Sequence, residues 1–348
     1  MGKIRKNKKK AWHDKRSKKL QTKWYGKEER IRSFSKSNES DIEEIHYNKD
    51  HQFVAKTPEY FSLIDNTEET IRYFNTIIYV IEKKKFKQGF YLDSSKVRRV
   101  TTEALIYMIA VIYNIKANKA LQYTFEGNLP ISKSAQDVFK KSGYLNYFKM
   151  KRLKMPDSSE CVEIVSGKNV ETDTARKICD FVIDKLGVSR RHTKVLYATL
   201  IELMSNTARH AYQDKHKMME NCWYLYAIYD GDKIKFSFVD TGEGIPSTIK
   251  KKLTEKLNFS IDDSRFLELS LTESGRSETG LANRGRGLPN LYDHVKDGSI
   301  SDFYVLSGTG SCIYNKSEHN LLLTEYTHRI FGTIFSFSIK KENVLCAK

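Results

Sequence analysis

The sequence predicts an α/β protein with two successive α/β regions behind a basic N-terminal arm. From about residue 60 to 150, short apolar runs typical of strands alternate with segments of helical periodicity. Beyond about residue 170, two helical segments precede a β-hairpin pattern and a late strand. The 348 residues are 39% hydrophobic, which is enough for a sizeable core.

The basic arm carries most of the excess positive charge. Residues 1–36 hold 15 of the 60 Lys and Arg residues and 3 of the 43 Asp and Glu residues, in a chain of net charge +17. Such a block repels itself and is expected to be disordered or loosely helical alone. Two interpretations stay open: an arm that binds nucleic acid or another polyanion, or a solubilising tail. Residues 37–58 are polar and predict a linker.

Cysteine spacing and hydropathy favour a cytoplasmic protein. The five cysteines are widely spaced and form no CxxC pair: Cys161, Cys179, Cys222, Cys312 and Cys346. This pattern indicates reduced, buried thiols. The longest apolar stretch, Ala104 to Ile112, has 9 residues, whereas spanning a bilayer takes about 20. It therefore predicts a core helix, and no membrane partner is expected.

The first α/β region has a predicted order of helix, strand, helix, strand and helix. The expected elements are a helix over 68–86, a strand at Phe90–Leu92, a helix over Glu103–Ile115, a strand at Leu121–Phe125, a turn at Gly127–Asn128 and a helix over Ser134–Ser142 closed by Gly143. Thr101 or Thr102 can cap the second helix. Short connections between these elements predict a small α/β sheet.

Part of this region resembles the STAS domains of anti-sigma-factor antagonists. The resemblance lies in Tyr91–Ser95 and the run through Val97 and Val100 to the helix start at 101–103, although the family's Asp-Ser-(Ser/Thr)-Gly core is absent. It implies a hydroxyl at the helix start that accepts a phosphate from a partner kinase, which would be Thr101 or Thr102. The other interpretation is that these threonines only cap the helix.

The second region begins with two predicted helices, Thr174–Leu186, stopped by Gly187, and Arg191–Tyr212. In the latter, Glu202 and Asn206 are four residues apart and share the face opposite the apolar one. A carboxylate and a carboxamide so placed can orient a water and supply an oxygen to Mg²⁺. Such a pair also occurs on ordinary solvated faces.

A β-hairpin, Leu225–Tyr229 and Ile234–Val239, leads directly into Asp-Thr-Gly-Glu-Gly-Ile at residues 240–245. Asp240 at a strand end can accept a hydrogen bond from an exocyclic amine such as that of adenine. Gly242 and Gly244 let the backbone approach a flat ring. An isolated motif of this kind also occurs in ordinary loops.

Two further motifs follow. The glycine-rich run from Gly280 to Asn290 opens a helix, and its amides together with Arg284 and Arg286 suit phosphates. Gly332 and Thr333 precede the predicted strand Ile334–Ile339. No Walker GxxxxGK[ST] sequence occurs, so a P-loop is excluded.

These four motifs, in this order, resemble those of the GHKL (Bergerat-fold) ATPases, and most closely those of the anti-sigma-factor kinases. The resemblance implies an α/β sandwich that binds ATP and Mg²⁺, with residues 246–284 as a lid. Glu202 corresponds to the catalytic base, Asn206 to the Mg²⁺ ligand, Asp240 to the adenine contact and Thr333 to the residue that assists Asp240. The implied nucleotide contacts are Asn206, Asp240, Gly242, Gly244, Ile245, Gly285, Arg286, Gly287, Leu288 and Thr333.

The resulting domain prediction has five parts: an arm and linker (1–58), a STAS-like region (59–150), a connection with one short strand, Val162–Val165 (151–170), a GHKL region (171–342) and a tail (343–348). Neither a transducer domain nor a histidine-kinase dimerisation helix is expected. The favoured function is a nucleotide-dependent switch that hydrolyses ATP slowly and acts on a protein partner. A protein Ser/Thr kinase and a nucleic-acid-associated ATPase are alternatives, and homodimerisation stays open.

Overall fold

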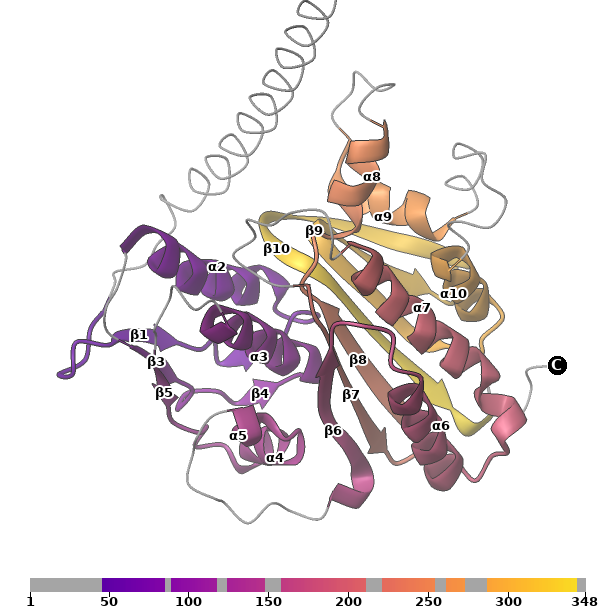
Figure 1. Cartoon of the computed structure of the whole chain (residues 1–348), viewed down its shortest axis with the longest axis horizontal. Coiled ribbons are helices and arrows are strands. Elements are labelled where there is room, and N and C mark those ends of the chain that lie inside the picture. The colour runs from indigo at the N-terminus through magenta and orange to yellow at the C-terminus, as the bar shows by residue number, and fades with distance from the viewer. Residues whose placement is uncertain are drawn as a thin grey trace, which may run out of the picture. The chain divides into compact units, whose positions relative to one another are not determined.

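The computed structural model of the chain describes residues 46–84, 89–117, 124–147, 158–210, 221–253, 261–272 and 287–342. It confirms the α/β class (Figure 1). Two units compose the chain: residues 46–75 with 86–348, and residues 1–45 with 76–85. The basic arm and the tail at 343–348 lie outside the described residues. All contacts below lie within the larger unit.

The first part of the larger unit is a small parallel α/β arrangement. Its elements are β1 (Phe53–Lys56), β2 (Tyr60–Phe61), α2 (Thr67–Lys84), β3 (Phe90–Asp93), β4 (Arg99–Val100), α3 (Thr102–Ala117), β5 (Phe125–Gly127), α4 (Lys133–Lys141) and α5 (Tyr144–Tyr147). Strands β1, β3 and β5 form one parallel sheet in that order, and β2 pairs with β4 in parallel. Parallel pairing needs crossover connections, which α2 and α3 provide.

Two predictions for this part need correction. The linker predicted over 37–58 is wrong for Phe53–Lys56, which is a strand of the sheet. Only Phe53 and Ala55 of β1 are buried, and four residues are too few for a clear alternation. The turn predicted at Gly127–Asn128 is wrong for Gly127, which ends β5 (Phe125–Gly127) and pairs with Leu92. Of the strand predicted at Leu121–Phe125, residues 121–123 lie outside the described residues. The predicted helices correspond to α2, α3 and α4.

The second part is built on a five-stranded antiparallel sheet. Its elements are η1 (Ser158–Glu160), β6 (Cys161–Gly167), α6 (Thr172–Leu186), η2 (Arg190–Thr193), α7 (Lys194–His210), β7 (Trp223–Asp230), β8 (Lys233–Asp240), α8 (Ile245–Leu253), α9 (Asp263–Leu271), α10 (Gly287–Lys296), β9 (Ser301–Asn315) and β10 (Asn320–Lys340). The strand order is β6-β7-β8-β10-β9, and all neighbours are antiparallel.

The predicted β-hairpin is confirmed as β7 and β8, and the predicted helix over 174–186 is α6. The strand predicted within the connection is longer than expected and forms an edge of the large sheet as β6. The helix predicted from Arg191 begins at Lys194, after the turn η2. The late strand Ile334–Ile339 is the end of the much longer β10, and β9 has no counterpart among the predicted elements.

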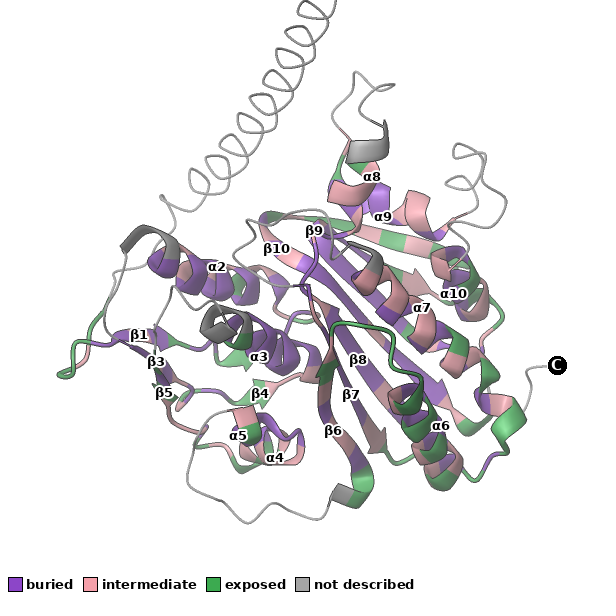
Figure 2. Cartoon of the chain, viewed as in Figure 1, coloured by how far each residue is buried: buried purple, intermediate pink, exposed green. Residues whose placement is uncertain are grey.

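The large sheet is buried on both faces. Side chains alternate between the faces of a strand, and on one face Trp223, Leu225 and Phe236 share a core with α6, α7 and α10. Tyr224 and Tyr226 point to the other face and are also buried. There α3 contacts β7, β8 and β10. Figure 2 shows the resulting burial along β7 and β8.

Candidate functional site

Helix α7 presents the predicted Glu–Asn pair on its outer face. Leu196, Leu200, Leu203 and Met204 are buried in the core, whereas Glu202 and Asn206 are half-buried. The C-terminal end of α7 lies at the end of the large sheet where β8 ends and α8 begins (Figure 1). Periodicity therefore predicts the helix face on which these two half-buried side chains lie.

The structure brings Glu202 against the start of α10. A Cβ atom at Gly287, the first residue of α10, would lie 1.9 Å from Cδ of Glu202. A side chain at position 287 would therefore have to displace this carboxylate, which is the flexible end of the Glu202 side chain. The first amides of a helix attract negative charge, which suits a carboxylate or a phosphate. The Glu202 carboxylate and the start of α10 therefore lie together as one polar site.

Only the last four residues of the glycine-rich run, Gly287–Asn290, belong to the described residues. Gly285 and Arg286 lie outside them, whereas Gly287 begins α10 and Leu288 is half-buried against the core. Pro289 is buried in the first helical turn, where its missing N–H costs no helical hydrogen bond. The proline is therefore compatible with the predicted helix start.

The Asp240 motif forms a tight turn at the end of β8. The Gly242 N–H donates to Oδ1 of Asp240 at 2.8 Å, and a Cβ at Gly242 would also lie 2.8 Å from that oxygen. The buried Thr241 hydroxyl accepts from Cys222 N–H at 3.0 Å and donates to its carbonyl at 3.2 Å. These contacts fix the direction in which the Asp240 carboxylate points at the end of β8.

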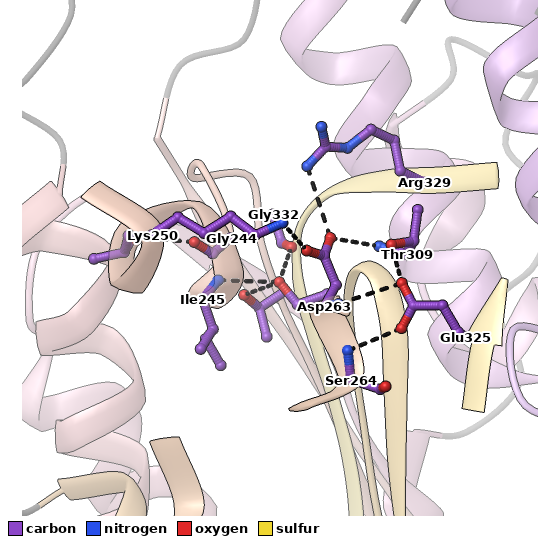
Figure 3. A network of polar contacts seen from close by, with 12 residues as sticks. Gly244, Ile245, Lys250, Asp263, Ser264, Thr309, Glu325, Arg329 and Gly332 are labelled. Carbon is purple, nitrogen blue, oxygen red and sulfur yellow. Dashed lines mark hydrogen bonds and ion pairs between the residues drawn. The ribbon is translucent and has the colours of Figure 1, made fainter. Parts of the chain in front are cut away.

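Ser307 of β9, which belongs to none of the predicted motifs, joins this turn to β10. Its hydroxyl is fully buried, accepts from Ile245 N–H at 3.1 Å and donates to the Gly332 carbonyl at 2.7 Å. The Thr333 hydroxyl lies 3.1 Å from the Ser307 hydroxyl. A serine has one hydrogen to donate, so the Thr333 hydroxyl is the donor in this pair. In Figure 3, Gly244, Ile245 and Gly332 lie side by side.

Two glycines allow these strands to approach. Gly332 has φ 79°, and a Cβ there would lie 1.8 Å from the Asp240 carbonyl oxygen. Gly244 has φ 82°, and a Cβ there would lie 2.7 Å from Oγ of Ser307. Positive φ favours glycine. Thr333 is the ladder partner of Asp240 across β8 and β10, so the predicted adenine-site residues gather in one place.

Part of the predicted lid is anchored to the β9–β10 hairpin. Asp263, whose side chain is 5% exposed, accepts from Lys250 Nζ at 2.6 Å and from Thr309 N–H at 3.0 Å, and lies 4.0 Å from Arg329 (Figure 3). Burial alone raises the pKa of Asp263, but these hydrogen bonds and cationic charges lower it overall. Glu325 accepts from the N–H groups of Asp263 and Ser264 at 3.3 and 3.0 Å, capping α9. These contacts tie α9 directly to the hairpin, and α8 is joined to α9 through the ion pair of Lys250 with Asp263.

The threonines at the start of α3 face the interior. Thr101 N–H donates to the Phe61 carbonyl at 3.0 Å, and α3 begins at Thr102, so a helix start here is confirmed. The hydroxyls of Thr102 and Ser237 share a hydrogen bond of 2.6 Å. Thr102 therefore contacts the large sheet, which is a structural use of its hydroxyl.

The described part of the chain holds free thiols but neither a membrane-spanning helix nor a metal cluster. No helix in the described ranges has the length and apolar character needed to cross a membrane. The four described cysteines are free thiols, three of them buried. Where the structure is described, no three His, Cys, Asp or Glu side chains gather as a metal cluster. Magnesium shared with phosphates needs only one or two protein ligands.

Comparison of the chain with models of protein families gives no match. Comparison with curated proteins gives none either.

Proposed function

We propose that this chain binds Mg-ATP in the manner of the GHKL ATPases and acts as a nucleotide-dependent switch on a protein partner, with slow ATP hydrolysis. The observation that carries the proposal is the polar cluster where the end of β8 meets the middle of β10. There Asp240 and Thr333 are ladder neighbours beside the Gly242–Gly244 turn. The proximity of the Glu202 carboxylate to Gly287 at the start of α10 supports it.

Each residue has a role that follows from its position. Asp240 would accept a hydrogen bond from the adenine amino group. Thr333 donates its hydrogen to Ser307, so its oxygen is left as an acceptor beside Asp240. A side chain at position 242 would contact the Asp240 carboxylate. Because glycine has none, the backbone at this position is open to a flat ring.

The phosphate end would lie at the start of α10, near Gly285, Arg286, Gly287 and Leu288. Asn206 would supply an oxygen to Mg²⁺, which prefers oxygen ligands. When bound, the ion would neutralise charge on the phosphates. Glu202 would accept a proton from the attacking water, because its carboxylate lies beside the start of α10 and the residue is half-buried.

Titration of the purified chain with Mg-ATP tests the proposal. Asp240→Asn and Asn206→Ala should each reduce affinity at least tenfold, since each removes a contact to a different part of the nucleotide. Asp230→Asn is the matched control, because Asp230 ends β7 beside the hairpin turn and pairs with Lys235. Unchanged affinity in both site variants would reject the proposal.

Incubation with γ-labelled ATP separates the switch from a protein kinase. Release of phosphate that Glu202→Ala abolishes, without labelled protein, supports the switch. Labelled protein that depends on Glu202 would favour the kinase instead. Binding to a protein partner, formation of a homodimer and binding of nucleic acid by residues 1–36 are further proposals for this chain. Removal of residues 1–36 should weaken salt-dependent binding to a polyanion if the arm has that role.

A further inference from the structure

One segment of β10 connects the first α/β part to the candidate site. The β10 bulge, Tyr326–Gly332, lies where β10 departs from regular pairing with β9. The register passes from Glu325 opposite Gly310 to Ile330 opposite Gly308 and then to Thr333 opposite Ser307. Residues within such a bulge leave ladder positions, and their backbone groups need other partners.

Side chains from the first α/β part supply two of these partners. Glu68 of α2 accepts from Thr327 N–H at 3.3 Å and contacts Nδ1 of His328. Tyr107 of α3 accepts from Phe331 N–H at 3.0 Å and donates to the Phe331 carbonyl at 3.2 Å. One phenol thus satisfies both backbone groups of a single residue.

Tyr107 is itself rigidly held. It is 1% exposed, and its ring packs edge-on against Phe74 with centroids 4.7 Å apart. Burial, and to a lesser extent the charge of Asp240, raises the pKa of Tyr107 well above its ordinary value. The phenol therefore keeps its hydrogen at physiological pH, and its contact with Phe331 does not titrate there.

The residue held by Tyr107 is followed directly by Gly332 and Thr333. Gly332 contacts the Asp240 carbonyl so closely that a Cβ would lie 1.8 Å from it, and its own carbonyl accepts from Ser307. A displacement of Phe331 therefore moves the carbonyl that orients Ser307. Because Ser307 binds both Ile245 N–H and the Thr333 hydroxyl, the change reaches both sides of the predicted adenine contact.

We propose that Tyr107 is a positioning residue for the adenine end of the nucleotide site and acts on Thr333 and Asp240 through the β10 bulge. This inference rests on the proposed nucleotide binding. It assigns to α3 a role in base recognition, beyond covering the second face of the large sheet.

The test compares wild type, Tyr107→Phe and Tyr144→Phe in titrations with Mg-ATP and Mg-GTP. Tyr144 is the matched control, because it is also a buried tyrosine of the first α/β part, and its hydroxyl contacts Met108 Sδ. Wild type is expected to prefer ATP, since guanine presents a carbonyl where adenine presents an amine. Loss of the Tyr107 hydroxyl should weaken ATP binding about fivefold and reduce the ATP preference, whereas Tyr144→Phe should keep that preference.

A second measurement needs no variant. Coupling between two sites is reciprocal, so Mg-ATP should slow amide hydrogen exchange at Phe331 in the wild-type chain. Unchanged exchange there, under saturating ATP, would overturn the inference.

The outcomes distinguish the two proposals. If wild type binds no Mg-ATP, the proposed function is overturned, and the role of Tyr107 with it. If wild type binds ATP and Tyr107→Phe binds it with unchanged affinity, only the role of Tyr107 is overturned. An equal loss of affinity for ATP and GTP in Tyr107→Phe would indicate general loosening of the site. That result would also overturn the role of Tyr107.

Discussion

Glu103, in the first turn of α3, should make the protein more stable as pH falls from 8 to 5. The side chain is almost fully buried, and this burial raises its pKa from 4.5 to about 6, although hydrogen bonds from Thr101 and Thr102 oppose the shift. The folded state therefore holds the proton more tightly than the unfolded state. The resulting contribution is complete below pH 4.5 and is lost as pH rises through about 6. A difference of this size corresponds to about 2 kcal/mol of unfolding free energy.

The variant Glu103→Gln removes this titration. Urea unfolding at pH 5 and pH 8 should show that the variant gains stability relative to wild type at pH 8, by about 1 kcal/mol more than at pH 5, because at pH 5 most but not all of the contribution is present. Glu126→Gln is the control, because Glu126 is exposed on β5. Groups such as Asp263 titrate in both proteins and cancel in the comparison. A wild-type-minus-variant difference that is the same at both pH values would refute the reasoning.

Three further changes follow from the contacts described. Gly332→Ala should lower the melting temperature and weaken Mg-ATP binding at least tenfold, because its Cβ would overlap the Asp240 carbonyl; normal melting and binding would contradict this. Asp263→Asn should cost about 1–3 kcal/mol at pH 7, because Lys250 loses its carboxylate. Since the pKa of Asp263 is lowered, this cost should shrink as pH falls below 3.8, which unfolding curves at pH 7 and pH 3 would check. Gly187→Ala should cost about 1 kcal/mol in urea unfolding, because the residue that ends α6 has φ 63°; an unchanged midpoint would argue against strain there.

The elements that sequence predicted well are those with a strong local pattern. Helix α6 has a regular apolar face and ends at a glycine with positive φ, and the β7–β8 hairpin alternates around the turn at Gly231. Strand β1 is four residues long, and its place in a parallel sheet depends on β3, which lies far along the chain. No local pattern of that length distinguishes a strand from a linker.

The difference between local patterns and pairing of distant segments also decides which residues of the candidate site could be predicted. The predicted residues Glu202, Asp240 and Thr333 lie in short motifs with fixed spacing. Ser307 was not identified, because its role depends on pairing between β9 and β10. A signal for it existed in the alternation Ser-Gly-Thr-Gly-Ser at residues 307–311, since glycines within a strand often mark close backbone approach. Gly308 and Gly310 indeed face Asp263 and Ser264, at distances that leave no room for a Cβ.

The two α/β parts of the larger unit share a buried interface, which affects how the candidate site can function. Tyr226 and Val239 on the second face of the large sheet are buried, and α3 contacts three strands of that face. Residues Ala104–Ile112 of α3 are buried throughout, so this stretch of the helix has no solvated side to which it could turn. Separation of the two parts would expose apolar surface, at a free-energy cost of about 25 cal/mol for each Å². A signal that alters the first part is therefore most easily transmitted by small shifts at bonded contacts such as Tyr107–Phe331, which leave the shared core closed.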